Sequence, residues 1–240
     1  MAVVSCRLPR LELPLVGQTA PEIPLYTGDI DRDAWELIRG KRAEEITGGL
    51  AYPSKMDCPA WGISATRCRV GSILATQENT VCHSCYAMKG TFRAKNVADK
   101  LERAYRGLLD VRWTPALYAL IRWQAKDRFR FFHSGDFQGK NHFLNIMRIC
   151  AATRDVLFWI PTREAGLVRE NAAAIPGNAL VRVSGNVIDG PAPSWWPTTS
   201  TVVTDPRNAT CPSSKKGGNC GTHKCAACWT TEGNVAYAKH

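Results

Sequence analysis

The feature that most constrains the fold is a regular alternation of short apolar runs and helical stretches between residues 128 and 206. Apolar runs at 128–135, 156–161, 178–185 and 199–206 are accompanied by helical patterns at 140–155 and 163–175. Strands that alternate with helices predict βαβ units and a parallel sheet. We therefore expect an α/β protein with a small or partial (β/α) barrel, and a doubly wound open sheet is the alternative.

The remaining chain divides around this alternation. We expect an N-terminal arm at 1–45 with one short helix at 31–45, a barrel-like catalytic domain at 46–210, and a C-terminal cysteine-rich segment at 211–240. Two further helices are predicted at 93–113 and 115–127, where apolar residues recur at helical spacing. One or two extra strands are expected around 45–52 and in the arm.

Charge and hydropathy limit the partners and the location. The formal net charge is +10 and the pI is near 9.3, a balance that suits a polyanion such as nucleic acid. No apolar run reaches the roughly 18 residues needed to span a bilayer. The start of the chain lacks the features of a signal peptide. We expect no membrane partner and a cytoplasmic location, in the host cell if a phage encodes the protein.

Eight of the ten cysteines fall into two sets of four that each end in C-x-x-C. The first set is Cys58, Cys68, Cys82 and Cys85, and the second is Cys211, Cys220, Cys225 and Cys228. A reducing cytosol argues against structural disulfides, and four thiolates suit zinc or an iron–sulfur cluster. The spacing does not separate these two cofactors, and both centres could be purely structural.

Four other residues bear on these sets. His223 lies inside the second set and could replace one cysteine as a ligand, whereas His83 lies inside the first C-x-x-C and is expected to be a neighbour. Cys6 and Cys150 are left over, and Cys150 is predicted to be a small core residue in a helix.

The polar segments that follow the predicted strands are the expected place for chemistry, because parallel strands present their carboxyl ends at one edge of a sheet. These segments are "HSGDFQ" (133–138), "PTREAG" (161–166), "SGNVIDG" (184–190) and "TDPRN" (204–208). Asp136 and Asp205 directly follow their strands and are the candidate catalytic carboxylates. Glu164 could instead be a first-turn acid of the next helix, and either aspartate could be a simple cap.

The pattern "CHSCYAMKG", then "FFHSGDF", then "FWIPTRE" resembles a small phage gene-product family known from mycobacteriophages. In addition, "HSGDFQ" resembles the base-holding S-G-G-F-Q loop of tRNA-guanine transglycosylases and of their DNA-acting relatives, called DpdA. Those enzymes are β/α barrels with a C-terminal cysteine-rich zinc site. This resemblance implies an enzyme that exchanges guanine for a 7-deazaguanine base, with DNA as the preferred target over RNA.

The transglycosylase resemblance assigns roles to particular residues. Asp205 would be the nucleophile and Asp136 the general acid/base. The base pocket would be lined by His133, Ser134, Gly135, Phe137 and Gln138, and further substrate contacts are expected from Arg163, Trp195 and Trp196. His133 stands where that family carries an acid, and Asp136 stands where it carries a second glycine.

A second resemblance is to radical SAM enzymes, in which a three-cysteine loop follows the first strand of the barrel. The order "CHSCY", "HSGDF" and "VRVSG" runs parallel to that plan, although the usual C-x-x-x-C-x-x-C spacing is absent. This alternative implies an iron–sulfur cluster held by Cys68, Cys82 and Cys85, with S-adenosylmethionine (SAM) as cofactor. Cys58 would then not be a ligand of the cluster. A third hypothesis is a zinc-stapled module that only binds nucleic acid.

Overall fold

A computed structural model describes residues 21–39 and 42–239 of the chain. It contains a sheet of six strands, which are β1 (Ala60–Trp61), β2 (Arg128–Phe131), β3 (Leu157–Thr162), β4 (Ala179–Ser184), β5 (Thr198–Val203) and β6 (Gly233–Ala238). Strands β2 to β5 coincide with the four predicted apolar runs, whereas the sequence did not predict β6. The first part of the predicted N-terminal arm, including Cys6, lies outside the described residues.

The strands are all parallel and follow the order of the chain, from β1 at one edge to β6 at the other. A doubly wound sheet would reverse its strand order at a switch point, so this alternative is wrong. The described strands form an open sheet, because β1 and β6 do not pair with each other. The parallel α/β prediction is therefore confirmed, but closure into a barrel is not seen.

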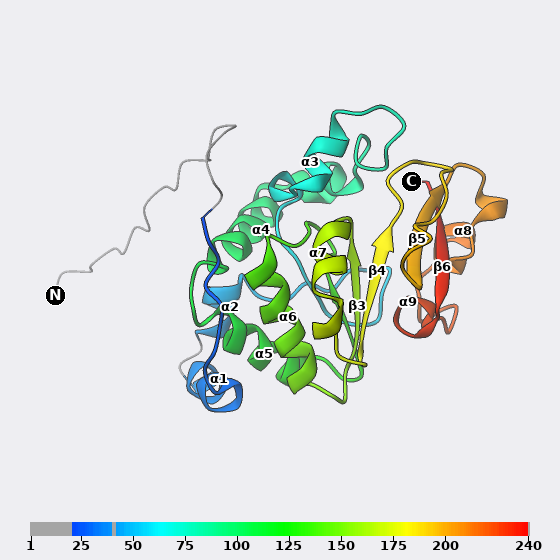
Figure 1. Cartoon of the computed structure of the whole chain (residues 1–240). Coiled ribbons are helices and arrows are strands. Elements are labelled where there is room, and N and C mark those ends of the chain that lie inside the picture. The colour runs from blue at the N-terminus through cyan, green and yellow to red at the C-terminus, as the bar shows by residue number, and fades with distance from the viewer. Residues whose placement is uncertain (1–20, 40–41, 240) are drawn as a thin grey trace.

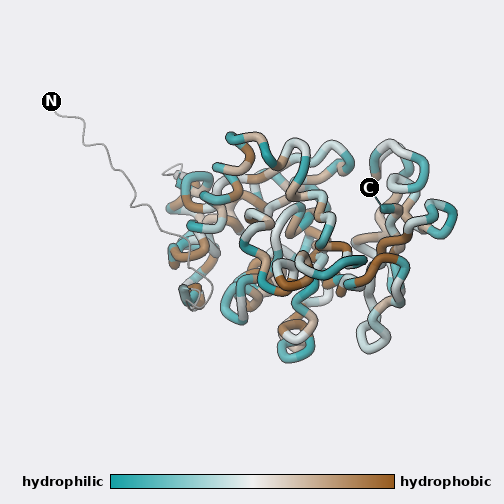
Figure 2. The backbone as a smooth tube through the Cα atoms, turned by 90° about the horizontal axis from the view of Figure 1, so that it is seen from above, coloured by the Kyte–Doolittle hydropathy of each residue, from teal (hydrophilic) through white to brown (hydrophobic). Residues whose placement is uncertain are grey.

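Helices cover one face of this sheet (Figure 1). The longer ones are α1 (Ile30–Arg39), α4 (Lys95–Gly107), α5 (Trp113–Gln124) and α6 (Lys140–Ala152). The shorter ones are α2 (Ala43–Thr47) and α7 (Ala165–Glu170), whereas α3 (Val70–Ala75) lies beyond the carboxyl ends of the strands. Phe129, Phe131 and Phe158 point from the sheet into the helical layer and form the main core with α5 and α6. Figure 2 shows hydrophobic segments in the helices and in the strands, whereas many outer loops are hydrophilic.

The strand residues that alternate with these core residues point to the opposite face of the sheet. Trp159 packs against Trp229 of α9 (Ala227–Thr230), with ring centroids 5.2 Å apart. Helix α8 (Pro212–Lys216) and α9 both belong to the chain between β5 and β6. The segment expected as a separate cysteine-rich unit at 211–240 therefore supplies the last strand and covers part of the second face.

Arg182 of β4 fixes this C-terminal segment in place. Its side chain is fully buried and donates hydrogen bonds to the carbonyl oxygens of Thr199, Gly233, Ala227 and Thr231 at 2.7–3.1 Å. Because unpaired buried carbonyls are costly, the guanidinium holds α9 and the start of β6 against the sheet.

Most other sequence predictions of elements are confirmed. Helices α4 and α5 occupy the predicted ranges, and the predicted helix at 31–45 is present as α1 and α2. A strand around 45–52 was wrong, because α2 ends at Thr47 and only Ala51 forms an isolated bridge, with Ala60. No helix in the described part of the chain is long and apolar enough to cross a membrane.

Candidate functional site

The loop after β1 brings three cysteines to the carboxyl edge of the sheet. Cys68 ends a 3-10 turn, and α3 follows it directly. A Cβ atom placed on Gly71 of α3 would lie 3.6 Å from the sulfurs of both Cys68 and Cys82, so these sulfurs are separated by at most twice that distance. The amide of Cys85 donates to the carbonyl of Cys82 at 3.2 Å, which holds the C-x-x-C turn.

The charges of this cluster act on one another. Burial raises the pKa of the Cys68 thiol, and the negative charges of Asp136 and Cys85 raise it further. Cys82 acts in the same direction, whereas the guanidinium of Arg163 lowers the pKa. For Cys82, burial again raises the pKa, and Arg163 is the largest opposing influence. The three thiols, Asp136 and Arg163 therefore share one electrostatic site.

The spacing of the sulfurs bears on which metal group they fit. Sulfurs that bind one tetrahedral zinc ion lie about 3.8 Å apart, since the Zn–S bond is about 2.3 Å. As the side chains stand, no group of three or more His, Cys, Asp or Glu in the described residues is arranged to hold a metal ion. An iron–sulfur cluster is a larger body than one ion, so its cysteines stand further apart. The three thiols suit such a cluster in donor type.

Asp136 ties the end of β2 to the end of β3. The carboxylate is buried and accepts hydrogen bonds from Phe137 N at 2.8 Å, Thr162 Oγ1 at 2.6 Å and Arg163 N at 2.8 Å. Burial raises its pKa to about 6 despite these donors. Gly135 permits this turn, because it has φ +82° and any Cβ there would meet Ile63 at 2.4 Å.

A second carboxylate links β3 to the cysteine loop. Glu164 Oε1 accepts the amide of Val70 at 3.1 Å, at the start of α3, and the amide of Glu164 donates to Thr162 Oγ1 at 3.0 Å. Gln138 adds a further link, because its side-chain amide donates to the carbonyl of Arg67 at 2.9 Å. Glu164 and Gln138 thus position the loop that carries the thiols, and Asp136 joins the two strand ends from which they extend.

The remaining residues of the "HSGDFQ" segment do not all line a pocket. Phe137 is fully buried and packs against Phe132 and Phe143, so it is a core residue. Burial lowers the pKa of His133 to about 4, and its Nδ1 atom has no hydrogen-bond partner. Ser134 Oγ is likewise buried without a partner. The side chains of His133 and Ser134 therefore have polar atoms that a ligand could bind. Phe137 packs in the core instead, and Gln138 bonds to the cysteine loop.

Asp205 lies apart from Asp136. Strands β3 and β4 separate their two strands, which places the strand ends about 14 Å apart at ordinary strand spacing. The Asp205 side chain caps a 3-10 turn by accepting Arg207 N at 2.9 Å, and it pairs with Arg207 Nη2 at 2.7 Å. The expectation that both carboxylates face one cavity is not met by this arrangement.

The tryptophan pair occupies the loop before β5. Trp196 Nε1 donates to the carbonyl of Val181 at 2.7 Å, and its ring packs against the main core. Trp195 is partly exposed, with the Arg169 guanidinium 4.4 Å from the centre of its ring. Trp195 is therefore the more exposed of the two rings.

Cys58 is not part of the carboxyl-edge cluster. It lies two residues before β1, whereas Cys68 follows β1, so the two stand at opposite ends of that strand. Cys58 packs instead with Cys228, Trp159 and Trp229 in a second apolar cluster, where Cys211 also lies. The sequence-based grouping of Cys58 with Cys68, Cys82 and Cys85 was therefore wrong, because linear proximity took no account of the strand between them.

The C-terminal cysteines gather around this second cluster. Burial raises the pKa of Cys220, and the charges of Cys211 and Cys225 raise it further. Burial raises the pKa of Cys58 to about 12, with a smaller rise from Cys220. Cys228 is buried and its sulfur lies 3.2 Å from the hydroxyl of Tyr237. The His223 ring forms a hydrogen bond with the carbonyl of Gly217 at 2.7 Å, and this half-buried histidine is a neighbour of the group.

The sequence of the chain matches the model of a protein family. A model described as Gene product 88 matches residues 31–231. The chain belongs to the Gene product 88 family. This result is consistent with the expected phage gene-product family, and the match spans both cysteine groups and Asp136. No curated protein and no solved structure matches the chain.

Two residues of the site escaped the sequence analysis. Tyr86 follows the C-x-x-C and donates its hydroxyl to the carbonyl of His133 at 2.7 Å, joining the cysteine loop to the end of β2. Arg130 donates to Tyr86 and stacks its guanidinium 4.2 Å from the ring centre of Trp159. The alternation of Arg and Phe in "RFRF" signals that both arginines of β2 share the face opposite the helical core.

Proposed function

We propose that this member of the Gene product 88 family is an iron–sulfur enzyme that resembles radical SAM enzymes and modifies nucleic acid. The observation that carries the proposal is the gathering of Cys68, Cys82 and Cys85 after the first strand of an all-parallel sheet, beside Asp136 and Arg163. Catalytic groups of parallel α/β proteins are found at this edge.

The number of thiols supports this choice. With Cys58 at the other end of β1, three protein thiols remain, which is the number that leaves one iron of a four-iron cluster open to a cofactor such as SAM. When bound, the cluster would supply one-electron chemistry. Arg163 favours the thiolate forms of Cys68 and Cys82, as metal binding requires.

Other residues would shape the space next to the cysteines. Ser134 Oγ, His133 Nδ1 and Arg163 Nε are buried polar atoms without protein partners. Such atoms are costly unless a ligand or water satisfies them. They lie at the ends of β2 and β3, where they could hold the polar groups of a cofactor or substrate.

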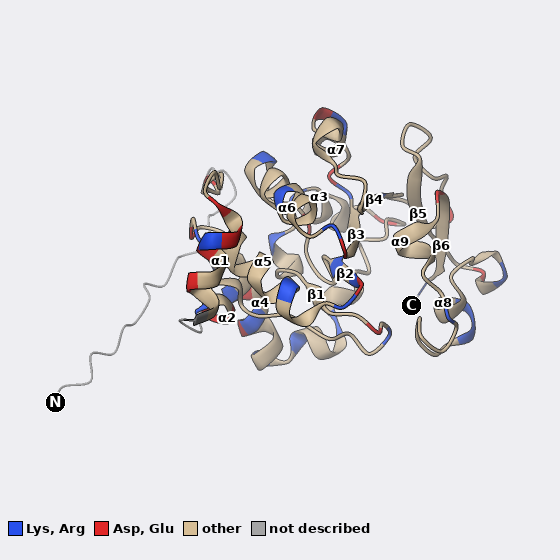
Figure 3. Ribbon diagram, turned by 90° about the horizontal axis from the view of Figure 1, so that it is seen from below, with Lys and Arg blue, Asp and Glu red and all other residues tan. Residues whose placement is uncertain are grey.

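A basic rim beside the cysteine loop supports a nucleic-acid substrate. Figure 3 shows basic positions spread over many elements, so net charge alone does not locate a binding face. Lys89 and Arg93 are exposed immediately after the C-x-x-C, and neither belongs to an ion pair among the described residues. Tyr86 is half-exposed and packs against Phe92 at 5.8 Å. Phosphates and bases could therefore bind next to the thiols.

The test is SAM turnover by anaerobically reconstituted protein under reducing conditions, with and without single-stranded DNA. We expect wild type and Cys150→Ser, a core cysteine outside both groups, to cleave SAM. Cys82→Ser should lose the activity. Equal turnover in Cys82→Ser and wild type, or no SAM binding by a protein with a full cluster, would refute the proposal.

Guanine exchange in DNA remains a second candidate because of one observation. Asp136 has a pKa of about 6, near the value that suits a general acid/base at neutral pH. The corresponding nucleophile is less well supported, since Asp205 is engaged with Arg207. Incorporation of labelled 7-deazaguanine into duplex DNA by wild type, and its loss in Asp136→Asn, would favour this candidate. A colourless protein that contains only zinc would favour either this reaction or the zinc-stapled binding module.

A further inference from the structure

A second group of thiols lies near the amino ends of β1 to β3 and, for Cys211, beside β6, and it comes from distant parts of the chain. Cys58 precedes β1, whereas Cys211, Cys220 and Cys225 lie between β5 and β6. The backbone joins the two segments directly, because the amide of Cys220 donates to the carbonyl of Lys55 at 3.0 Å. This bond connects the beginning of the sheet to the segment that precedes its last strand.

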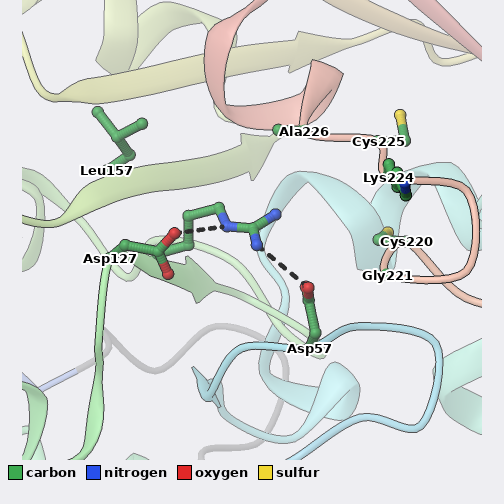
Figure 4. A pocket seen from close by; sticks show the side chains of 9 residues that line it. Asp57, Asp127, Leu157, Cys220, Gly221, Lys224, Cys225 and Ala226 are labelled. Atoms are coloured by element: carbon green, nitrogen blue, oxygen red, sulfur yellow. Dashed lines mark hydrogen bonds and ion pairs between the residues drawn. The ribbon is translucent and has the colours of Figure 1, made fainter.

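Cys220 is the centre of this group. Its carbonyl accepts the amide of Cys225 at 3.0 Å, which closes the loop between the two thiols. Both cysteines line a pocket of about 430 Å³, together with Asp57 and Arg128 (Figure 4). Cys58 follows Asp57, and Cys211 packs with Cys58 in the second apolar cluster. Two of the four thiols therefore line the pocket, and the other two belong to the apolar cluster.

Cys228 lies in the same apolar cluster as Cys58, and its C-x-x-C spacing points to the same group of thiols, but it has a hydrogen-bond partner of its own. Its sulfur is buried in the apolar cluster and lies within hydrogen-bond distance of the Tyr237 hydroxyl. This pairing gives Cys228 a structural explanation that requires no metal. Linear spacing favours Cys228 as a ligand, but the fold offers Cys58 in its place.

We propose that Cys58, Cys211, Cys220 and Cys225 form a four-thiolate metal centre that fastens the C-terminal segment to the loop before β1. Four thiolates suit either a zinc ion or an iron–sulfur cluster. The centre uses none of the residues on which the proposed function rests. The thiols do not converge as they stand, so binding requires their side chains to rotate. Such rotations cost little compared with the free energy of binding a structural zinc ion.

Arginines next to this region support the binding of an anionic centre. Four thiolates around a divalent ion carry a net negative charge, which is costly to bury without compensation. Arg128 forms an ion pair with Asp57 at 3.1 Å and lines the pocket. Arg130 places its guanidinium over Trp159 and next to Met56, two residues of the same apolar cluster. Both cations lie on the β2 face that the thiols border.

The first test compares the metal content of three serine variants in the full chain. Cys58→Ser should lower the metal content by one centre, whereas Cys228→Ser and the core control Cys150→Ser should leave it unchanged. Zinc, iron and sulfide are measured separately, which distinguishes an ion from a cluster. Full metal content in Cys58→Ser would overturn the proposal, and so would wild-type protein that takes up no metal at this centre. Loss of the other centre is monitored separately with Cys82→Ser.

The second test uses wild type alone, in case Cys58→Ser does not fold. Removal of metal by a chelator should accelerate hydrogen exchange in 55–58 and in 220–225 together, and re-added metal should restore protection to both. The shared response follows from a centre that joins the two segments. Faster exchange in 220–225 with unchanged exchange in 55–58 would contradict a role for Cys58.

Discussion

Replacing Gly71 by alanine should weaken the carboxyl-edge centre without touching any ligand. The added Cβ would lie 2.9 Å from the Cβ of Cys68, whereas carbon atoms in contact prefer about 3.5–4.0 Å. Either Cys68 or α3 must therefore move. Because the new neighbour is the Cβ itself, rotation of the Cys68 side chain does not relieve the contact. Overpacking of this kind costs about 1–3 kcal/mol.

If that free energy falls on the metal-bound arrangement, iron affinity should decrease roughly 5- to 150-fold. The assay is competition with a chelator, followed by the visible absorption of the cluster, on anaerobically prepared protein. Gly166→Ala is the matched control, since Gly166 lies in α7 and a Cβ there would meet nothing within 4 Å. We expect the control to bind iron as wild type does and to be slightly more stable, by up to about 1 kcal/mol.

Two results would refute this reasoning. One is a Gly71→Ala protein that retains wild-type iron affinity. The other is a variant whose metal-free form loses as much stability as its metal-bound form, because the strain would then be independent of the centre.

Three further predictions concern pH, packing and charge. Burial raises the pKa of Asp136 to about 6, and the stability that this contributes at low pH decreases above about pH 4 and is lost as the pH rises through 6. Between pH 4 and pH 7, metal-free wild type should therefore lose roughly 2 kcal/mol relative to Asp136→Asn in urea titrations. A pH-independent difference would contradict this. Arg182→Met removes four charge-assisted hydrogen bonds to backbone carbonyls and should cost at least about 3 kcal/mol, whereas exposed Arg154→Met should be neutral in the same titrations. Equal stabilities of the two variants would contradict the role of Arg182. Changing both Lys89 and Arg93 to Gln should lower the slope of log affinity for single-stranded DNA against log salt concentration by about 1.4. The same change at Lys215 and Lys216 of α8 should leave the slope unchanged. Equal slopes for the two double variants would contradict DNA binding at the basic rim.

The sequence predicted the parallel sheet well because its strands are short apolar runs between helices of clear periodicity. It did not predict β6, since "GNVAYA" follows the cysteine-rich loops and lacks a helix of ordinary length before it. Its pairing with β5 depends on tertiary contacts such as those of Arg182, which a local pattern cannot show.

The candidate site was predicted in part. Cys68, Cys82 and Cys85 could be grouped from their spacing, and Asp136 could be placed at a strand end. The position of Cys58 could not be predicted, because β1 is only two residues long and leaves almost no periodic signal. Asp205 was proposed as a partner of Asp136 because both follow strands, but strand order, which the sequence does not give, separates them.

The iron–sulfur cluster at the carboxyl edge is tested most directly by the iron and sulfide content of anaerobically purified protein, measured for wild type, Cys82→Ser and Cys150→Ser. We expect a brown wild-type protein with iron and acid-labile sulfide, the same content in Cys150→Ser, and the loss of one cluster in Cys82→Ser. A colourless wild-type protein, or a Cys82→Ser variant with the same iron and sulfide as wild type, would contradict a cluster at the carboxyl edge of the sheet.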